Sequence, residues 1–380
     1  MRSPICSMFE IEFPLLAFTH CRDVVVEVSK AGGMGVLGAA GLTPSQLAVE
    51  LEWIDEHIDG RPYGVDLIVP TSFESKGEQV DAQGMVAKVP EEHRQFVRQL
   101  VAQHGLDAEQ IVPADSTSGT RLGDNMRDEG AGALLDVAFA HPIQLIVNAL
   151  GTPPPYMLER AQQAGVRTAA LVGAKEHAIK QVEAGVDILV VAGGEAGGHC
   201  GDIATLVLVP EVVEAIKPYG DTPILAAGGI VTGRQMAACM AMGAAGAWTG
   251  SVWLTTSEAE TSPVVKEKML NASSRQTVRS KARTGKYSRQ LRSAWTDAWE
   301  AEDAPAPLPM PLQSIVTEPP MARITKLAEG GHQGAQQLAS YFVGQGVGLM
   351  NDSVSAKTVV YEFMQDFLAA TERLNSFTAE

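Results

Sequence analysis

The sequence is short of cysteine and of positive charge. Its 380 residues include four cysteines and no C-x-x-C spacing, so neither a disulfide framework nor a metal site is expected. Lysine and arginine total 29 against 45 acidic residues, which gives a formal net charge of -16. An acidic surface repels phosphate backbones, so we expect no nucleic-acid partner.

Long apolar runs are missing as well. No run reaches the roughly 20 residues that a membrane-spanning helix needs, and the N-terminal residues lack the apolar stretch of a signal peptide. We therefore expect a cytoplasmic protein with no membrane partner. Hydrophobic residues still make up 45% of the chain, and its length allows one large domain with additions or two domains.

Short apolar runs alternate with segments of helical pattern. This alternation predicts parallel strands covered by helices, and eight units fit a (β/α)8 TIM barrel. A doubly wound sheet is the alternative, but no G-x-G-x-x-G turn follows the first strand. The predicted strands are Phe13–Phe18, Gly35–Leu37, Tyr63–Val69, Gln144–Ala149, Thr168–Val172, Ile188–Ala192, Pro223–Ala227 and Gly246–Trp248. The helices expected between or after them include Pro44–His57, Pro155–Ala164, Lys175–Ala184, Pro210–Lys217 and Gly233–Met242.

Two regions exceed a minimal barrel. We predict a barrel domain over residues 1–254 with an insertion at 71–141 after the third strand. Residues 255–380 form a C-terminal extension, part lid and part helices closing the barrel, with helices near Met321–Glu329 and Ala356–Leu374 and a basic segment at 266–292. Both additions follow strand ends on the face where barrels bind substrates, so we expect them to roof a pocket for a bulky substrate.

The loop after the sixth predicted strand is the most informative segment. Residues 193–201 read GGEAGGHCG and contain one acid, Glu195, and one imidazole, His199. Glycines let backbone approach a flat or anionic ligand, and a histidine at a strand's carboxyl end is typical of a catalytic loop. A mobile loop with a solvated histidine is the alternative.

A second pair of turns follows the last two predicted strands. Gly228 and Gly229 end one strand, and Gly250 and Ser251 end the next. Turns at these positions of a barrel commonly cradle a phosphate with backbone N–H groups. Alternatively, the glycines only let helices pack close to strands.

Three further polar residues lie at or near predicted strand ends. Asp66 and Asn148 interrupt apolar strands, and a polar residue there needs a hydrogen-bond partner. A heteroaromatic ligand could supply that partner. For Asp66, a hydrogen bond within the barrel is the favoured alternative. His20 follows the first strand, either over a cofactor or exposed to solvent.

These motifs resemble the nitronate monooxygenase family, formerly called 2-nitropropane dioxygenase, and its relatives, the FMN-dependent enoyl-ACP reductases. The resemblance rests on GGEAGGHCG at 193–201, LVPEVV at 208–213, AAGG at 226–229 and GAAGAWTGS at 243–251. Further matches are AGGMGVLG at 31–38 and GQGVGLM at 344–350.

The resemblance implies a TIM barrel that holds FMN without a covalent link, with His199 as the catalytic base. The residues it places at the cofactor are Ala17, Phe18, Thr19, Asp66, Asn148, Gly194, Gly198, Ala227, Gly228, Gly229, Gly250 and Ser251. His20 and Glu195 are candidates for substrate contact. The loop after the first strand reads Ala-Phe-Thr-His where the family usually has Ala-Pro-Met, and Asp66 stands where it often has Asn.

The implied reaction is oxidation of alkyl nitronates, or a bulkier carbanion-forming substrate, with O2. A flavin reductase that takes hydride from NAD(P)H for enones, quinones or enoyl thioesters is the alternative, in which the basic segment could bind nucleotide phosphates. A non-catalytic flavin-binding protein is a third reading. A homodimer is compatible with the sequence.

Overall fold

The computed structural model describes residues 1–69, 82–112 and 128–378, and at its centre eight parallel strands close into a barrel. Successive strands pair with each other, and the last pairs with the first, Leu16 lying opposite Trp248. The predicted TIM barrel is therefore confirmed. Its strands are β1 (Leu15–Thr19), β2 (Met34–Gly38), β3 (Tyr63–Leu67), β4 (Leu145–Asn148), β5 (Arg167–Val172), β6 (Ile188–Ala192), β8 (Ile224–Ala227) and β9 (Gly246–Thr249).

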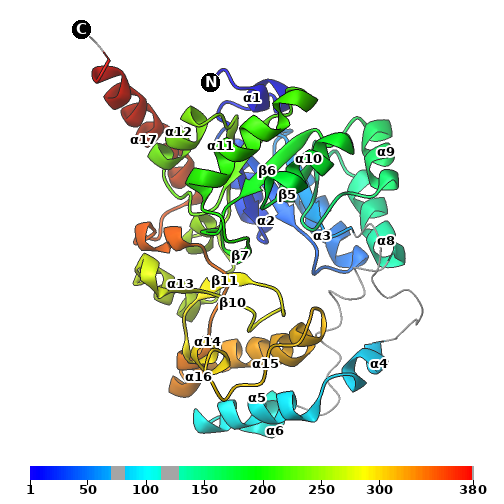
Figure 1. The fold of residues 1–380 in the computed structure, drawn as a ribbon, viewed down its shortest axis with the longest axis vertical. Coiled ribbons are helices and arrows are strands. Elements are labelled where there is room, and N and C mark those ends of the chain that lie inside the picture. Colours follow the sequence, from blue (N-terminus) through cyan, green and yellow to red (C-terminus); the bar gives the residue numbers. More distant parts are fainter. Residues whose placement is uncertain (70–81, 113–127, 379–380) are drawn as a thin grey trace.

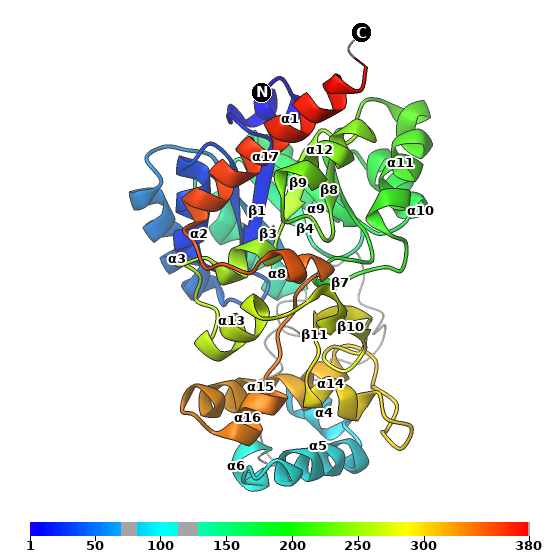
Figure 2. The same cartoon turned by 90° about the vertical axis from the view of Figure 1, so that its left-hand side faces the viewer.

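Helices cover the outside of the barrel, and a short helix closes its amino-terminal end (Figures 1 and 2). The short helix is α1 (Pro4–Phe9), whose Ile5 and Phe9 pack with the barrel interior. The last helix packs against the helix that follows β1 and the helix that precedes β9. It thereby completes the outer layer. The covering helices are α2 (Arg22–Lys30), α3 (Pro44–His57), α8 (Asp128–Phe139), α9 (Pro155–Ala164), α10 (Lys175–Glu183), α11 (Thr205–Ile216), α12 (Gly233–Ala241) and α17 (Ala356–Ser376).

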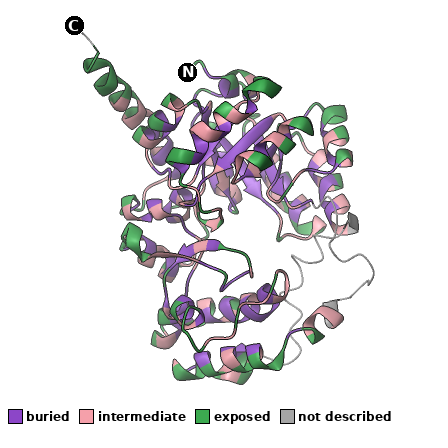
Figure 3. Ribbon diagram, viewed as in Figure 1, coloured by how far each residue is buried: buried purple, intermediate pink, exposed green. Residues whose placement is uncertain are grey.

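Strand side chains alternate between the inside of the barrel and the helices. On β1, for example, Leu16 and Phe18 belong to the interior, while Leu15 and Ala17 pack with the covering helices. Both faces of the strands are thus buried, as their continuous apolar runs indicate (Figure 3).

A second group of helices, here called the helical region, lies beyond the carboxyl ends of the strands (Figure 2). It combines two segments that are far apart in the sequence, and they share one apolar core containing Val97, Trp295 and Ile324. Arg323 joins the segments by donating to the carbonyl of Ile111 at 2.9 Å. The helices are α4 (Ala82–Ala87), α5 (Glu91–Gln103), α6 (Ala108–Ile111), α13 (Pro263–Leu270), α14 (Ala294–Trp299), α15 (Leu312–Glu329) and α16 (Gln333–Leu338).

A three-stranded antiparallel sheet, here called the small sheet, links the barrel to the helical region. Its order is β10 (Thr277–Ser280), β11 (Ser288–Leu291) and β7 (Gly198–His199). The first two strands come from the C-terminal extension, and β7 belongs to the loop that follows β6. This sheet therefore brings residues of the extension to the mouth of the barrel (Figure 1).

Two helices begin earlier than predicted, and both contain prolines in their interior. Helix α11 starts at Thr205 rather than at Pro210, since the side chain of Glu195, from the loop that leads into the helix, caps its first turn. Helix α15 starts at Leu312 rather than near Met321, although Pro319 and Pro320 lie within it. Its first turns are anchored by side-chain bonds to the 282–283 backbone and packed in the core of the helical region. Tertiary contacts here outweigh the loss of a backbone donor.

Candidate active site

His199 lies on β7, which the extension holds in place. His199 pairs with Ser288 of β11, and Gly198 pairs with Arg289. The N–H of Cys200 donates to the carbonyl of Tyr287 at 3.3 Å. The glycine-rich loop is thereby anchored by backbone hydrogen bonds to a hairpin about 90 residues further along the chain.

The hydrogen bonds around His199 favour one of its two neutral tautomers. Nε2 of His199 lies 2.8 Å from the hydroxyl of Thr284. That hydroxyl can donate its proton to the carbonyl oxygen of Lys286 at 3.2 Å while it accepts from the ring, an arrangement that satisfies all three groups. The ring then donates from Nε2, and Nδ1 keeps a lone pair that can accept a proton or hydrogen bond.

The surroundings of His199 keep its ring uncharged. Burial and, secondarily, the positive charge of Lys286 lower the pKa of His199 to about 4. The side chain is nevertheless accessible to solvent. His199 is therefore both exposed and neutral, so a ligand could reach an uncharged imidazole.

The side chain of Glu195 interacts with the start of a helix rather than with His199. Its carboxylate accepts hydrogen bonds from the N–H and the hydroxyl of Thr205, at 2.9 and 3.0 Å. Thr205 is the first residue of α11, so the carboxylate caps the helix where its dipole favours negative charge. The side chain of Glu195 thus forms a helix cap and no hydrogen bond with His199.

Aromatic rings gather at the barrel mouth. Phe18 stacks against Trp248, with ring centroids 6.0 Å apart, and meets the ring of His20 edge-on at 5.1 Å. Nδ1 of His20 bonds to the carbonyl of Gly38 at 2.7 Å, and burial lowers the pKa of His20. A Cβ at Gly38 would come within 2.7 Å of both the Phe18 and His20 rings, so glycine makes room for them.

Asp66 lies on the same side of the mouth, next to Gly38 in the strand register. It is only 3% exposed, and burial raises the pKa of its carboxyl well above the usual range, which favours the uncharged acid. Its carboxyl makes no hydrogen bond with any of the residues described. The bond within the barrel that the sequence favoured is therefore not found among them.

Asn148 ties two loops together. Its Oδ1 accepts from the N–H of Val69 at 2.9 Å, and its amide nitrogen donates to the carbonyl of Val69 at 3.1 Å. The same nitrogen lies within hydrogen-bond distance of the carbonyls of Leu150 and Gly151. These contacts occupy the side chain in fixing the loops after β3 and β4.

Of the β1 residues expected at the cofactor, only Phe18 presents its side chain to the barrel interior. Ala17 packs with the covering helices, and the hydroxyl of Thr19 accepts from the N–H of Cys21 at 3.1 Å. Ala17 could therefore contact a cofactor only through its backbone, whereas the hydroxyl of Thr19 still has a proton to donate.

The turns after β8 and β9 carry free backbone donors. Gly228 and Gly229 have φ of +106° and +69°, a conformation that favours glycine. Within the described part of the chain, the N–H groups of Gly228, Gly229 and Gly250 have no hydrogen-bond partner. The hydroxyl of Ser251 accepts from the N–H of Gly344 at 2.8 Å, so a C-terminal segment lies directly beside this cradle.

Close packing of neighbouring segments explains some of these glycines. A Cβ at Gly228 would lie 2.7 Å from the hydroxyl of Thr205, whereas one at Gly250 would make only ordinary contact with Phe18, at 3.7 Å. Packing therefore accounts for glycine at position 228 but not at 250.

The other predicted cofactor residues lie around the same loops. The carbonyl of Ala227 accepts from the N–H of Gly193 at 3.1 Å, and that of Gly194 accepts from Nε of Arg289 at 2.9 Å. Gly198 has φ of +74° in β7. These residues form the inner surface between the barrel and the small sheet.

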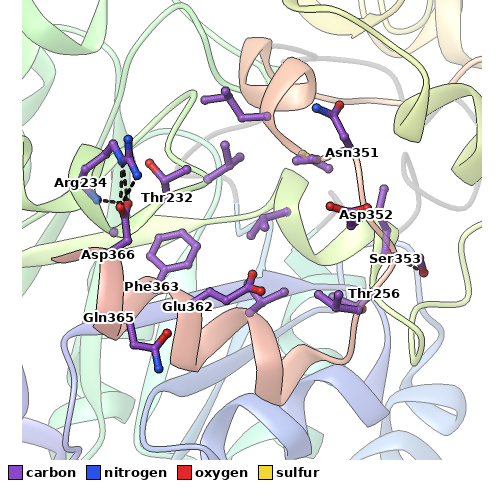
Figure 4. A pocket seen from close by; sticks show the side chains of 18 of the residues that line it. Thr232, Arg234, Thr256, Asn351, Asp352, Ser353, Glu362, Phe363, Gln365 and Asp366 are labelled. Atoms are coloured by element: carbon purple, nitrogen blue, oxygen red, sulfur yellow. Dashed lines mark hydrogen bonds and ion pairs between the residues drawn. The ribbon is translucent and has the colours of Figure 1, made fainter. Parts of the chain in front are cut away.

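Two cavities flank the segment that follows Gly344. One of about 340 Å³ is lined by Gly228 and Gly229 together with Glu195. A larger one of about 720 Å³ lies between α12, α17 and residues 349–354, with the ion pair of Arg234 and Asp366 at its edge (Figure 4). The larger cavity contains none of the predicted site residues.

The residues present fit a flavin phosphate and ring. Three unpartnered backbone donors on adjacent turns suit an anion, and the aromatic mouth with an unpartnered carboxyl at Asp66 suits a flat heterocycle with polar edges. His199 would supply an uncharged proton acceptor beside them.

Sequence reasoning missed the contribution of the extension. Thr284 and Arg289 form hydrogen bonds with the glycine-rich loop, and Lys286 acts electrostatically on His199. All three residues come from the hairpin that β10 and β11 form. The available signal was the density of basic residues over 266–292, which indicated an interaction but not its place.

Comparison with known proteins places the chain in a family. Residues 3–366 match the model of the family described as nitronate monooxygenase. Rv1533 of Mycobacterium tuberculosis is 49% identical over 98% of both chains, and a "Probable nitronate monooxygenase" of Staphylococcus aureus is 24% identical over 83% of this chain and 85% of its own. The chain belongs to the nitronate monooxygenase family.

Solved structures agree on the fold. Nitroalkane oxidase from Streptomyces ansochromogenes has a TM-score of 0.78 at 24% identity, covering 97% of this chain and 99% of its own. FabK from Thermotoga maritima has a TM-score of 0.72 at 24% identity, covering 99% of both chains. Family membership supports a flavin-dependent oxidoreductase. Among the described residues, no helix is long and apolar enough to cross a membrane.

Proposed function

We propose that the protein is an FMN-dependent oxidoreductase that oxidises alkyl nitronates with O2. The observation that carries this proposal is His199, a neutral imidazole with a free Nδ1, held by Thr284 in the glycine-rich loop of a nitronate monooxygenase family member. The chemistry of the bound flavin is to accept an electron from an electron-rich carbanion and deliver it to oxygen.

The barrel turns would hold the cofactor. The N–H groups of Gly228, Gly229 and Gly250 would donate to its phosphate, and the mouth lined by Phe18 would face its ring. Asp66, kept uncharged by burial, would donate a hydrogen bond to a polar edge of the ring, as an asparagine amide could. FMN rather than another flavin is proposed because the cradle would bind a terminal phosphate.

His199 would take the α-proton when a neutral nitroalkane is the substrate. A group whose pKa is lowered to about 4 is free to accept a proton at neutral pH, but its driving force for proton abstraction is small. A preformed nitronate needs no base. We therefore expect nitronates to react faster than the corresponding nitroalkanes.

Anaerobic mixing tests the proposal. The purified protein is mixed with a propane nitronate and, separately, with NADPH, while flavin absorbance is followed. Bleaching by the nitronate supports the oxidation proposed here. Bleaching only by NADPH would replace it with the reductase alternative, and no bleaching by either would leave a flavin-binding protein.

The NAD(P)H-dependent reductase remains a second candidate because of one observation. Several cations of the extension lie beside the glycine-rich loop without an acidic partner among the described residues, as phosphate recognition would require.

A further inference from the structure

The tip of the hairpin formed by β10 and β11 is held by α15. The side chain of Arg283 at this tip is buried, and its guanidinium forms two hydrogen bonds of 2.7 Å with the two carboxylate oxygens of Glu318. The side chains of Gln313 and Thr317 donate to two backbone carbonyls of the same tip, at 3.1 and 2.6 Å. One short stretch of α15 therefore holds both the backbone and a charged side chain of the tip.

Other segments enclose the tip as well. The centre of the Phe342 ring lies 4.9 Å from the guanidinium of Arg283, and Nη1 of Arg283 donates to the carbonyl of Ser340 at 3.4 Å. A Cβ at Gly285 would overlap with the carbonyl oxygen of Leu308. The tip therefore has little room to shift without breaking one of these contacts.

The same tip carries the residue that contacts His199. Thr284 follows Arg283 directly, and its hydroxyl lies 2.8 Å from Nε2 of His199. Neighbouring residues share a rigid peptide unit, so a movement of the Arg283 backbone also moves Thr284. The place of the His199 ring thus depends on how firmly Arg283 is held.

Stability alone does not explain an ion pair at this place. Taking charges out of water costs about as much free energy as their attraction returns, so well-packed apolar side chains would hold the tip equally well. An ion pair adds direction, because a guanidinium and a carboxylate form two parallel hydrogen bonds only when their planes are aligned. Such a contact is useful where the position of the next residue must be exact to within a fraction of an ångström.

We propose that Arg283 and Glu318 are positioning residues, which fix the hydroxyl of Thr284 and thereby hold the ring of His199 for proton abstraction. The inference deepens the proposed function and rests on it for the role of His199 as a base. Neither positioning residue touches the substrate in this arrangement. Nε2 of His199 stays with Thr284, and Nδ1 is left to meet the substrate.

The test replaces the ion pair with apolar side chains, Arg283→Met together with Glu318→Leu. Removing Glu318 alone by a large change would leave an uncompensated buried charge, whereas the apolar pair should fold as well as the wild-type protein. We expect an unchanged melting temperature and a roughly 2- to 10-fold lower kcat/KM for a neutral nitroalkane, as for the loss of one neutral hydrogen bond. Propane nitronate, which needs no base, should react as with the wild-type protein. Glu318→Gln, which keeps the shape of the side chain, is a second variant and should act in the same direction.

The ring of His199 can also be followed without any substrate. Burial and the charge of Lys286 lower the pKa of His199 to about 4. A ring released into water loses part of this effect, so its pKa should rise toward the ordinary value of 6.5. NMR titration of the flavin-containing protein, labelled at histidine, should show this rise in both variants.

The matched control is the ion pair of Arg160 and Asp136, which joins α9 and α8 on the outside of the barrel (Figure 1). Its charged atoms lie 2.8 Å apart, and Arg160 lies 5.1 Å from the centre of the Phe139 ring, much as Arg283 lies over an aromatic ring. Arg160→Met together with Asp136→Leu therefore removes the same groups. This control should leave both the nitroalkane turnover and the pKa of His199 unchanged.

A double-mutant cycle separates positioning from general support. Because the ion pair acts through the contact between Thr284 and His199, adding Thr284→Val to the apolar pair should cause little further loss of nitroalkane turnover. Additive losses, or an unchanged pKa of His199 in both the apolar pair and Glu318→Gln, would overturn the inference. A raised pKa with equal losses on nitroalkane and nitronate would support the positioning but contradict the proposed role of His199 as a base. The two failures are therefore distinguishable on the same samples.

Discussion

The barrel and the helical region are assembled in different ways. Each barrel strand pairs with the next strand along the chain, so the sequence order is also the spatial order. The helical region instead packs residues 82–112 against residues 263–343, with Val97 and Trp295 in one core. The barrel thus offers backbone turns at fixed places, while the small sheet brings side chains of the extension to the site.

The candidate site is built partly from the barrel and partly from the extension. The free amides of Gly228, Gly229 and Gly250 and the aromatic mouth belong to the barrel. The hydroxyl of Thr284, which orients His199, belongs to the extension. We expect cofactor retention to depend on the barrel, and proton transfer to depend on contacts between the two regions.

The largest expected effect comes from placing a negative charge in the barrel cradle. Gly229→Asp should give colourless protein, because the carboxylate would repel the phosphate and crowd Glu195, whose Cβ would lie 3.0 Å from the new Cβ. The measurement is flavin absorbance per protein after purification. Ser251→Asp should act in the same direction.

Gly165→Asp is the matched control for Gly229→Asp. Gly165 has φ of +68°, almost the same as +69° at Gly229, and a Cβ there meets nothing within 4 Å. This variant reproduces the backbone strain without the cradle and should remain yellow. If Gly229→Asp also stays fully yellow, the phosphate lies elsewhere.

The next effect concerns His199, where the two regions meet. His199→Asn keeps a donor for Thr284 but has no basic nitrogen, so activity on neutral nitroalkanes should fall about 10²–10⁴-fold. Preformed nitronates should be nearly unaffected. Steady-state rates on both substrates measure the split, with the exposed His177→Asn as control. Equal losses on both would make His199 a binding group rather than a base.

The barrel could be predicted because its pattern is local and repeated. Continuous apolar runs identified all eight strands, and the glycine-rich loop and turns marked their carboxyl ends. The predicted helix Pro44–His57 is confirmed with the same bounds, and Thr43 caps it by accepting from the N–H of Gln46. Each of these signals spans only a few residues.

The rest of the site could not be predicted, because its signals are distant or hidden. β7 has two residues, and its partner strand lies about 90 residues later, so no periodicity reveals the pairing. A single threonine such as Thr284 carries no signal of its role. Glu195 was a candidate for substrate contact, yet its partner is Thr205, ten residues along the chain.

A smaller effect is expected from pH. The folded protein keeps His199 neutral until the pH falls to about 4, below the ordinary histidine value of 6.5. Above that pH Nδ1 can accept a proton, and below it the ring is charged and cannot. The acidic limb of kcat/KM for nitroalkanes should therefore lie near 4, and a limb near 6.5 would mean that the ring is not shielded as the structure indicates.

The smallest effect should come from the extension side of the His199 contact. Thr284→Val preserves the shape of the side chain but removes the hydroxyl that fixes Nε2 at 2.8 Å. Loss of one neutral hydrogen bond is worth about 0.5–1.5 kcal/mol, so nitroalkane turnover should fall roughly 2- to 10-fold. Thr284→Ser retains the hydroxyl and should behave nearly as wild type. Flavin content should be unchanged in both, because the barrel alone supplies the cradle. A loss of flavin in Thr284→Val would show that cofactor retention also depends on the extension. A turnover loss as large as that of His199→Asn would mean that Thr284 itself contacts the substrate.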